Sequence, residues 1–230
     1  MEESTAVVTG ASRGIGASVA RLFAERGAHV VLCARGEDAL QPVVADVEAG
    51  GGSATALRAD ARDEFDLERL MAVAAREGGG IDLLVPCAGV YHGAPGETPL
   101  AEESYAAVDD HLRTNGRGVY AAVREAVPHL NDGARVLVPS GGVARDARPG
   151  YGSYAVSKAL AEALVRQFAA ELDAAVGVID PGTVSTDLTG GTGRDPDDVA
   201  PMFAWAATDA PAEEVDGRVV DLSAWRRATR

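Results

Sequence analysis

Residues 9–16 read TGASRGIG, a glycine-rich turn that directly follows the short apolar run at 5–9. Glycine lets a backbone turn tightly and come close to a pyrophosphate. A helical pattern begins near Gly14, so the N–H groups and the positive dipole end of that helix would face the same phosphates. The stretch predicts the first strand–turn–helix unit of a nucleotide-binding α/β fold. A plain glycine-rich turn is the alternative interpretation.

The rest of the chain repeats this alternation of apolar strand and helix. Strand patterns lie at 29–34, 54–59, 81–89, 134–140, 176–180 and 217–222, and helical patterns at 14–26, 37–49, 64–77, 101–130, 151–173 and 196–208. Such alternation produces right-handed crossovers and a parallel sheet covered on both faces. We therefore expect a Rossmann-type, doubly wound, seven-stranded parallel sheet in the order 3-2-1-4-5-6-7 with helices on both faces. No linker separates two domains, so residues 1–230 are expected to form a single domain.

Composition narrows the functional class. The net charge of −14 argues against binding to nucleic acid or to an anionic membrane surface, because both need a basic surface. No apolar run reaches the length of about 18 residues that a membrane span needs. The N-terminus lacks a signal-peptide pattern. Cys33 and Cys87 have no metal-type spacing, so we expect no metal site and a reducing, cytoplasmic location.

A tyrosine and a lysine stand four positions apart in GYGSYAVSK (150–158), as Tyr154 and Lys158. Residues at this spacing share one face of a helix. An ammonium beside a phenol favours the phenolate, which would lower the pKa of the tyrosine towards the operating pH. Of the 21 basic residues only Lys158 is a lysine, and a compact ammonium is not interchangeable with a guanidinium. The pair is a candidate for proton transfer, or else an exposed pair on a helix.

The glycine spacing G-x-x-x-G-x-G and the Y-x-x-x-K pair together resemble the short-chain dehydrogenase/reductase family, nearly from end to end of the chain. The resemblance implies hydride transfer between a nicotinamide cofactor and a carbonyl or alcohol, with Tyr154 as the acid/base and Lys158 also holding the nicotinamide ribose. It implies further that Asn115 supports a water linked to Lys158. It also implies packing of the helices at 101–130 and 151–173 in a homodimer or homotetramer.

The same resemblance gives the cofactor residues. Asp60 would contact the adenine, and Thr186 with the backbone of Val184 would bind the carboxamide. The full expected set is Gly10, Ser12, Arg13, Gly14, Ile15, Gly16, Arg35, Asp60, Ala88, Gly89, Tyr154, Lys158, Pro181, Gly182, Val184 and Thr186. A carboxylate at the end of the second strand would select NAD. That position holds Ala34, with Arg35 after it and Arg13 in the glycine loop, so we expect NADP(H), because guanidinium groups pair with a 2′-phosphate. Both arginines could also be ordinary surface residues.

The chain departs from the family at the catalytic serine. The family serine, which helps to polarise the substrate oxygen, usually stands 13 positions before the tyrosine. Ser140 stands 14 positions before Tyr154, and Gly141 occupies the usual position. Either the loop carries one extra residue and Ser140 is catalytic, which we favour, or Gly141 replaces the serine and the site is one donor short.

Two other departures concern the walls of the site. The fourth strand ends in PCAG (86–89), where the family typically has two asparagines. The segment after Thr186, which is a substrate lid in the family, is short and suggests an open pocket. The sequence therefore predicts an NADP(H)-dependent carbonyl reductase or alcohol dehydrogenase, without naming its substrate or its physiological direction. The alternative is a catalytically impaired nucleotide-binding regulator or scaffold. A nucleotide-sugar epimerase is disfavoured by the glycine spacing and the short length.

Overall fold

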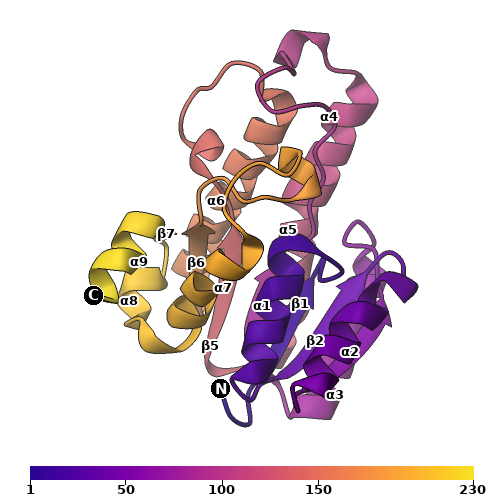
Figure 1. Cartoon of the computed structure of the whole chain (residues 1–230), viewed down its shortest axis with the longest axis vertical. Helices are drawn as coiled ribbons and strands as arrows, with labels where there is room; N and C mark the ends of the chain where they lie inside the picture. The colour runs from indigo at the N-terminus through magenta and orange to yellow at the C-terminus, as the bar shows by residue number, and fades with distance from the viewer.

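The computed structural model describes residues 1–230 and contains one sheet of seven parallel strands. The strands run in the order β3-β2-β1-β4-β5-β6-β7 (Figure 1). Their bounds are β1 Thr5–Thr9, β2 His29–Ala34, β3 Ser53–Arg58, β4 Ile81–Pro86, β5 Leu130–Pro139, β6 Ala175–Asp180 and β7 Val219–Asp221. The order reverses between β1 and β4, which creates a crevice beyond the carboxyl ends of these strands. The predicted fold class and strand order are confirmed.

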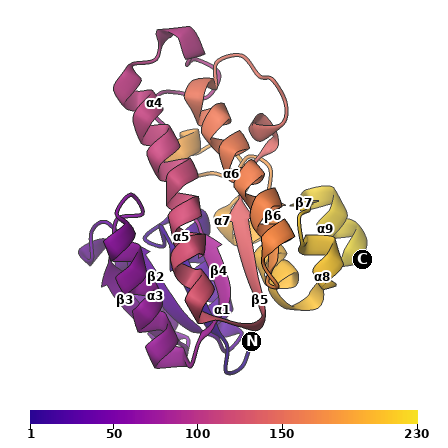
Figure 2. The ribbon, with the colours of Figure 1, turned by 180° about the vertical axis from the view of Figure 1, so that it is seen from behind.

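Helices cover both faces of the sheet (Figures 1 and 2). Their bounds are α1 Gly14–Glu25, α2 Gln41–Ala49, α3 Glu64–Gly78, α4 Tyr105–His111, α5 Gly118–Ala126, α6 Gly152–Glu171, α7 Pro196–Ala204, α8 Ala212–Val215 and α9 Leu222–Ala228. Successive residues of β1 point to opposite layers, as a strand requires. Val8 packs in one core with Phe23 of α1 and Phe203 of α7, whereas Val7 packs in the other core with Leu67 of α3.

The helical stretch expected at 101–130 contains a π-helical turn. It consists of α4, a π-helical turn at Leu112–Arg117 and α5, and β5 already begins at Leu130. A π-helical turn inserts an extra residue into a helix and is frequent at functional sites. Gly116 lies in this turn, where a Cβ would stand 2.3 Å from Cδ2 of Leu160, so the glycine lets α6 pack closely. The turn is the segment that carries Asn115.

The C-terminal part closes the sheet with less strand than expected. β7 has three residues, and the short helices α8 and α9 flank it, although no helix was predicted after residue 208. The side chain of Asp221 accepts a hydrogen bond from the backbone N–H of Ala224 at 2.7 Å and caps α9. No helix in the structure is both long and apolar enough to span a membrane.

Candidate active site

A cleft of about 1040 Å³ lies beyond the carboxyl ends of the strands. Parallel α/β sheets bind ligands at this edge, because loops from several strands meet there. The cleft is lined by every residue that the sequence analysis proposed for catalysis or cofactor binding. Segments that are distant in the chain, from the glycine loop to the lid after β6, therefore converge on a single cavity.

The glycine loop can adopt its path only because side chains are missing. Gly10 has φ +64°, and a Cβ there would lie 2.7 Å from the backbone N of Ala88. A Cβ at Gly16 would lie 2.6 Å from the carbonyl oxygen of Gly10. Contacts this short do not occur in folded proteins without a shift of the backbone. The loop therefore packs directly against the segment that follows β4.

The backbone N–H groups in the first turn of α1 donate no hydrogen bond to a capping side chain. The N-cap residue Arg13 makes no side-chain capping bond, and the turn contains no acidic residue. Uncapped N–H groups at the positive end of a helix dipole form a ready anion site. The cradle fits the phosphates of a dinucleotide, which the glycines allow to approach the backbone.

Basic side chains lie in the glycine loop and directly after β2. Arg13 pairs with Asp187 at 2.7 Å, and the two side chains are 70% and 69% exposed. Ala34 ends β2, and Arg35 after it is exposed in the cleft lining. No carboxylate occupies this strand end. Asp60, after β3, accepts hydrogen bonds from Arg62, and these hold the pKa of the Asp60 carboxyl below its usual value.

Tyr154 lies on the first turn of α6 and is packed among other rings. Tyr91 stacks on it with ring centroids 4.5 Å apart, and the ring of His111 meets it edge-on at 6.1 Å. Burial raises the pKa of Tyr154 to about 12, and the phenols of Tyr91 and Tyr151 add to the shift. The expected lowering of this pKa by Lys158 is absent in this geometry, in which the ammonium is bonded to the carbonyl of Pro139.

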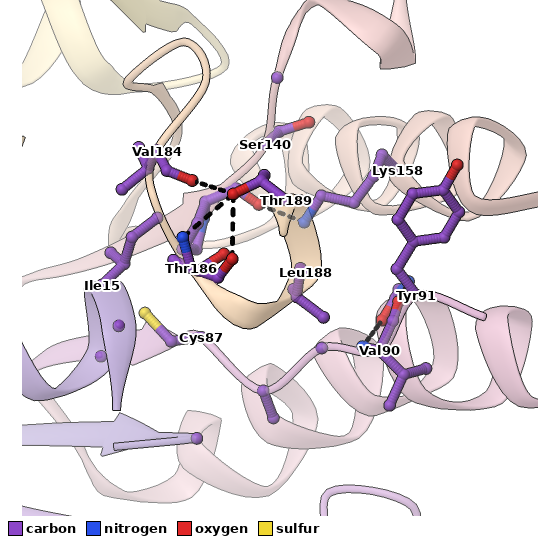
Figure 3. Close-up of a pocket in the computed structure, with 18 of the residues that line it drawn as sticks. Ile15, Cys87, Val90, Tyr91, Ser140, Lys158, Val184, Thr186, Leu188 and Thr189 are labelled. Atoms are coloured by element: carbon purple, nitrogen blue, oxygen red, sulfur yellow. Dashed lines mark hydrogen bonds between the residues drawn. The ribbon is translucent and has the colours of Figure 1, made fainter. Parts of the chain in front are cut away.

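Lys158 lies one helical turn after Tyr154, and its ammonium donates a hydrogen bond to the carbonyl oxygen of Pro139 at 2.7 Å (Figure 3). Pro139 is the last residue of β5, so this bond joins α6 to the strand end next to Ser140. Burial lowers the pKa of Lys158, while the charges of Glu162 and Asp180 act in the opposite direction.

Asn115 uses its whole side-chain amide to join two elements. Its Oδ1 accepts from the backbone N of Val90 at 2.8 Å, and its Nδ2 donates to the Val90 carbonyl and to Ser157 Oγ, both at 2.9 Å. The amide therefore fixes the segment after β4 against α6.

Ser140 and Gly141 both line the cleft at the end of β5. Ser140 is 8% exposed, and its hydroxyl has neither accessible surface nor a hydrogen-bond partner. A Cβ at Gly141 would meet no atom within 4 Å. An unpaired buried hydroxyl is unusual in a folded protein. The geometry leaves both arrangements from the sequence analysis open, namely a serine that turns to a ligand and a glycine in its place.

The lid segment after β6 is held by Thr189, a residue that the sequence analysis did not single out. Its hydroxyl donates to the Val184 carbonyl at 2.6 Å and accepts from the backbone N of Thr186 at 3.0 Å (Figure 3). The bond with Thr186 is half of a capping box around the short turn Asp187–Thr189, and the side chain of Thr186 accepts from the backbone N of Thr189 in the other half. A threonine three positions after Thr186 was the available signal.

The PCAG segment keeps its connection to β1 without asparagines. The backbone N of Ala88 donates to the hydroxyl of Thr9 at 3.2 Å. Burial raises the pKa of Cys87 to about 12, so its thiol stays protonated. Thr9, the last residue of β1, therefore supplies a side-chain hydrogen bond between the ends of β1 and β4 although PCAG contains no asparagine.

A series of hydrogen-bonded side chains packs against the ring of Tyr154 through His111. Nε2 of His111 accepts from the backbone N of His92 at 2.8 Å, so the ring proton lies on Nδ1, which bonds to Ser153 Oγ at 2.7 Å. Ser153 in turn donates to Glu103 at 2.8 Å. Burial lowers the pKa of His111, which therefore stays neutral. This series could not be predicted from the sequence, because its bonded members lie 19, 42 and 50 positions apart and match no motif.

The model of the family described as short chain dehydrogenase matches residues 4–197. The chain belongs to the short-chain dehydrogenase/reductase family. A family member of Aspergillus aculeatus, short chain dehydrogenase/reductase AacuN, is 36% identical over 189 residues, which are 80% of this chain and 70% of the relative. Versicolorin reductase 1 of Aspergillus parasiticus is 33% identical over 193 residues, covering 82% of this chain and 72% of the relative.

Solved structures of the family have the same architecture. The crystal structure of a short chain dehydrogenase from Burkholderia cenocepacia J2315 in complex with NADP aligns with a TM-score of 0.86 at 28% identity, covering 97% of each chain. Homologues in this family are NAD(P)-dependent oxidoreductases that act on small molecules, and the protein is an oxidoreductase of this type.

Proposed function

We propose that the protein is an NADP(H)-dependent carbonyl reductase or alcohol dehydrogenase in which Tyr154 is the acid/base. The observation that carries the proposal is the placement of Tyr154 and Lys158, one turn apart on α6, in the same cleft as the uncapped first turn of α1. One end of the cleft can hold the phosphates of a dinucleotide, and the other end offers a proton donor. A single sheet that extends from residue 5 to residue 221 supports treating residues 1–230 as one NADP-binding domain.

The state of the phenol supports the direction of reduction. With its pKa raised to about 12, Tyr154 is protonated at neutral pH and can donate that proton to a carbonyl oxygen. When bound, the nicotinamide supplies the hydride. The ammonium of Lys158 stabilises the negative charge that remains on the phenol oxygen, and Asn115 keeps the segment after β4 fixed against α6.

Ser140 is the proposed donor to the substrate oxygen. Ser140 directly follows Pro139, whose carbonyl Lys158 binds, and its hydroxyl is unpaired, so rotation about its Cα–Cβ bond towards a ligand would give it a partner. If Gly141 instead stands in the serine position, the chain is a nucleotide-binding regulator or scaffold with an impaired site. That second function rests on the open space beside Gly141.

The preference for NADP(H) rests on Arg13 and Arg35 at the adenosine end and on Ala34 in place of a carboxylate. The related Burkholderia structure holds NADP in the corresponding fold. Fluorescence of the two tryptophans, Trp205 and Trp225, during titration with NADPH and with NADH tests the preference. Equal affinities for the two cofactors would contradict it.

The proposed assembly is a homodimer or homotetramer through α5 and α6. The side chains of Tyr120, Val156 and Leu160 on these helices are 42%, 47% and 38% exposed, which leaves apolar surface on both helices for a partner to cover. Sedimentation at micromolar protein concentration tests the assembly, and a monomer alone would refute it.

The decisive experiment for the function is a screen of aldehydes, ketones and quinones, in which NADPH consumption is followed with the wild-type protein and with Tyr154→Phe. Turnover that depends on Tyr154 supports the reductase. Tight NADPH binding without turnover on any of these carbonyl classes would favour the regulator.

A further inference from the structure

Arg145, Glu162 and Asp180 form a triad of ion pairs near Lys158, and none of the three has been given a role above. Arg145, on the loop after β5, binds Glu162 of α6 through Nη1 at 2.5 Å and binds Asp180 at the end of β6 through Nη2. The side chains of the two acids are only 3% and 10% exposed. Removing the partner of a buried charge is strongly destabilising, so the arginine is needed wherever these acids are ionised.

The triad joins the three segments that build the proton-transfer site. Arg145 lies five positions after Ser140 on the same loop, and Glu162 lies on the helix of Tyr154 and Lys158. Asp180 directly precedes the Pro-Gly motif, and its second oxygen accepts from the backbone N of Gly182 at 3.0 Å. One guanidinium therefore connects the serine loop, the catalytic helix and the lid.

The position of Glu162 matters most for Lys158. Tyr154 precedes Lys158 by four residues on α6, and Glu162 follows it by four, so the lysine lies between a phenol and a carboxylate on one helix face. Oppositely charged residues at this spacing normally pair. In the structure they do not, because the Glu162 carboxylate is taken by Arg145 and the ammonium is bonded to the carbonyl of Pro139.

We propose that Arg145 is a positioning residue that keeps the ammonium of Lys158 on the carbonyl of Pro139, at the end of the strand that carries Ser140, by occupying the carboxylate of Glu162. Without the guanidinium, Glu162 would be the nearest unpaired charge one turn further along the helix, and the flexible lysine would turn towards it. The proposal rests on the proposed function for its effect on turnover, but not for its effect on the lysine itself.

The charged and titratable groups around the ammonium are known from each neighbouring element. Glu162 lies on α6, Asp180 at the end of β6, Cys87 after β4 and Arg145 on the loop after β5. The Cys87 thiol is protonated, so the charges that act on the ammonium are those of Glu162 and Asp180, both of which Arg145 pairs with. Removing the arginine leaves the acids to act on the ammonium unopposed.

The chain offers a selective probe, because Lys158 is its only lysine. Protein made with lysine that carries carbon-13 at Cε gives one lysine signal, and its chemical shift during a pH titration reports the pKa of Lys158. We expect Arg145→Met to raise that pKa by about one pH unit or more, since an opposite charge within a few ångströms has this effect. In NADPH-dependent turnover it should lower kcat by about 10- to 100-fold, as a displaced catalytic group does.

The double variant Arg145→Met/Glu162→Gln decides between positioning and mere structural support. It lacks both ion pairs of Arg145 just as the single variant does, but it also lacks the carboxylate four residues after Lys158, while Asp180 stays held by the hydrogen bond from the backbone N of Gly182. We expect it to return the pKa of Lys158 and most of kcat towards the wild-type values. Arg148→Met is the matched control, because Arg148 lies on the same loop but pairs with the exposed Asp146, at 3.1 Å. It should leave the lysine signal nearly unchanged.

A lysine pKa unchanged in Arg145→Met, or a double variant as slow as the single one, would overturn the proposal. Should Arg145→Met not fold, as thermal melting would reveal, Arg145→Gln keeps one donor for the acids and makes the same comparison. If the wild-type protein consumes no NADPH with any substrate, the proposed function fails, and the lysine titration still decides whether Arg145 controls Lys158.

Discussion

The two ends of the cleft are built in different ways. At the cofactor end, a continuous run of eight residues turns on glycines that no side chain could replace and then enters α1. At the catalytic end, the geometry depends on side chains from distant segments, such as Glu103 with Ser153 and Arg145 with Asp180. The first end is determined by local backbone geometry, and the second by long-range packing. Substitutions at the catalytic end should therefore alter turnover far more than nucleotide binding, even at Tyr154 and Lys158, which are also in the expected cofactor set.

The strongest test of this separation is removal of the proton donor. Tyr154→Phe should lower kcat by about 10²–10⁴-fold, the usual contribution of a positioned acid. Lys158→Arg should lower kcat by a similar factor, because it keeps the charge but not the compact ammonium. NADPH affinity of Tyr154→Phe, measured by tryptophan fluorescence, should remain close to that of the wild type. A parallel loss of affinity in Tyr154→Phe would show that the two ends are not separate.

The pH profile of the wild-type enzyme sharpens the same point. The pKa of Tyr154 is raised to about 12, so the phenol is protonated below that pH and deprotonated above it. Reduction, which needs the protonated form, should hold through neutral pH and decline only as the pH approaches this value. Oxidation, which needs the phenolate, should rise with pH. A reduction rate that declines already between pH 7 and 9 would contradict the raised pKa.

The next largest effect concerns the oxygen-orienting donor. Ser140→Ala should lower kcat by about 10²–10³-fold, with NADPH binding unchanged. Gly141→Ser is the companion variant, since its side chain would enter open space at the neighbouring position. It should give little gain if Ser140 already donates. The reverse pattern, with Ser140→Ala neutral and Gly141→Ser faster, would identify Gly141 as the missing serine position.

At the cofactor end the expected effect is smaller and concerns selectivity. Arg35→Asp places a carboxylate at the end of β2, where it repels a 2′-phosphate and accepts from the ribose hydroxyls of NADH. A charge-assisted hydrogen bond contributes about 1.5–3 kcal/mol, so the ratio of the NADPH and NADH affinities should change by about 10- to 100-fold. Fluorescence titration with both cofactors measures it. Arg26→Asp, at the end of α1 outside the cleft lining, controls for the change in net charge.

The smallest expected effect comes from the exposed ion pair between Arg13 in the glycine loop and Asp187 in the segment after β6. Arg13 pairs with Asp187 and must leave that carboxylate to reach a 2′-phosphate. Exposed ion pairs contribute about 0.2–1 kcal/mol, so Asp187→Asn should tighten NADPH binding by only about two- to five-fold. NADH affinity should not change. A gain of equal size for both cofactors would mean that Asp187 acts through the lid rather than through Arg13.

The strands and site residues that could be predicted are those that depend only on residues close together in the sequence. The bounds of β1 and β2 were predicted to the residue, because β-branched apolar runs bounded by turn residues are unambiguous. The strand order follows from the alternation of strands and helices. Candidate site residues could be named for the same reason, since motifs at strand ends meet at one sheet edge.

The remainder depended on contacts that residue spacing does not encode. The pKa of Tyr154 follows from burial among Tyr91 and His111, which come from different segments. The roles of Thr189 and Arg145 required knowing which carbonyl or carboxylate lies within reach. The helical stretch expected at 101–130 is confirmed from Tyr105 to Ala126, but its π-helical turn was not predicted, because helical periodicity does not distinguish an α-helix from one that contains such a turn.

The π-helical turn at Leu112–Arg117 has a consequence for changes in chain length. Each residue of an α-helix advances the side-chain direction by about 100°, since 3.6 residues complete a turn. Deleting one residue here would make the helix regular, but it would rotate α4 by about that angle relative to α5. His111 would then leave the edge of Tyr154, and Glu103 would lose Ser153. The length of this one turn therefore fixes the angular phase between the helix that packs on the sheet and the helix that supports the catalytic phenol.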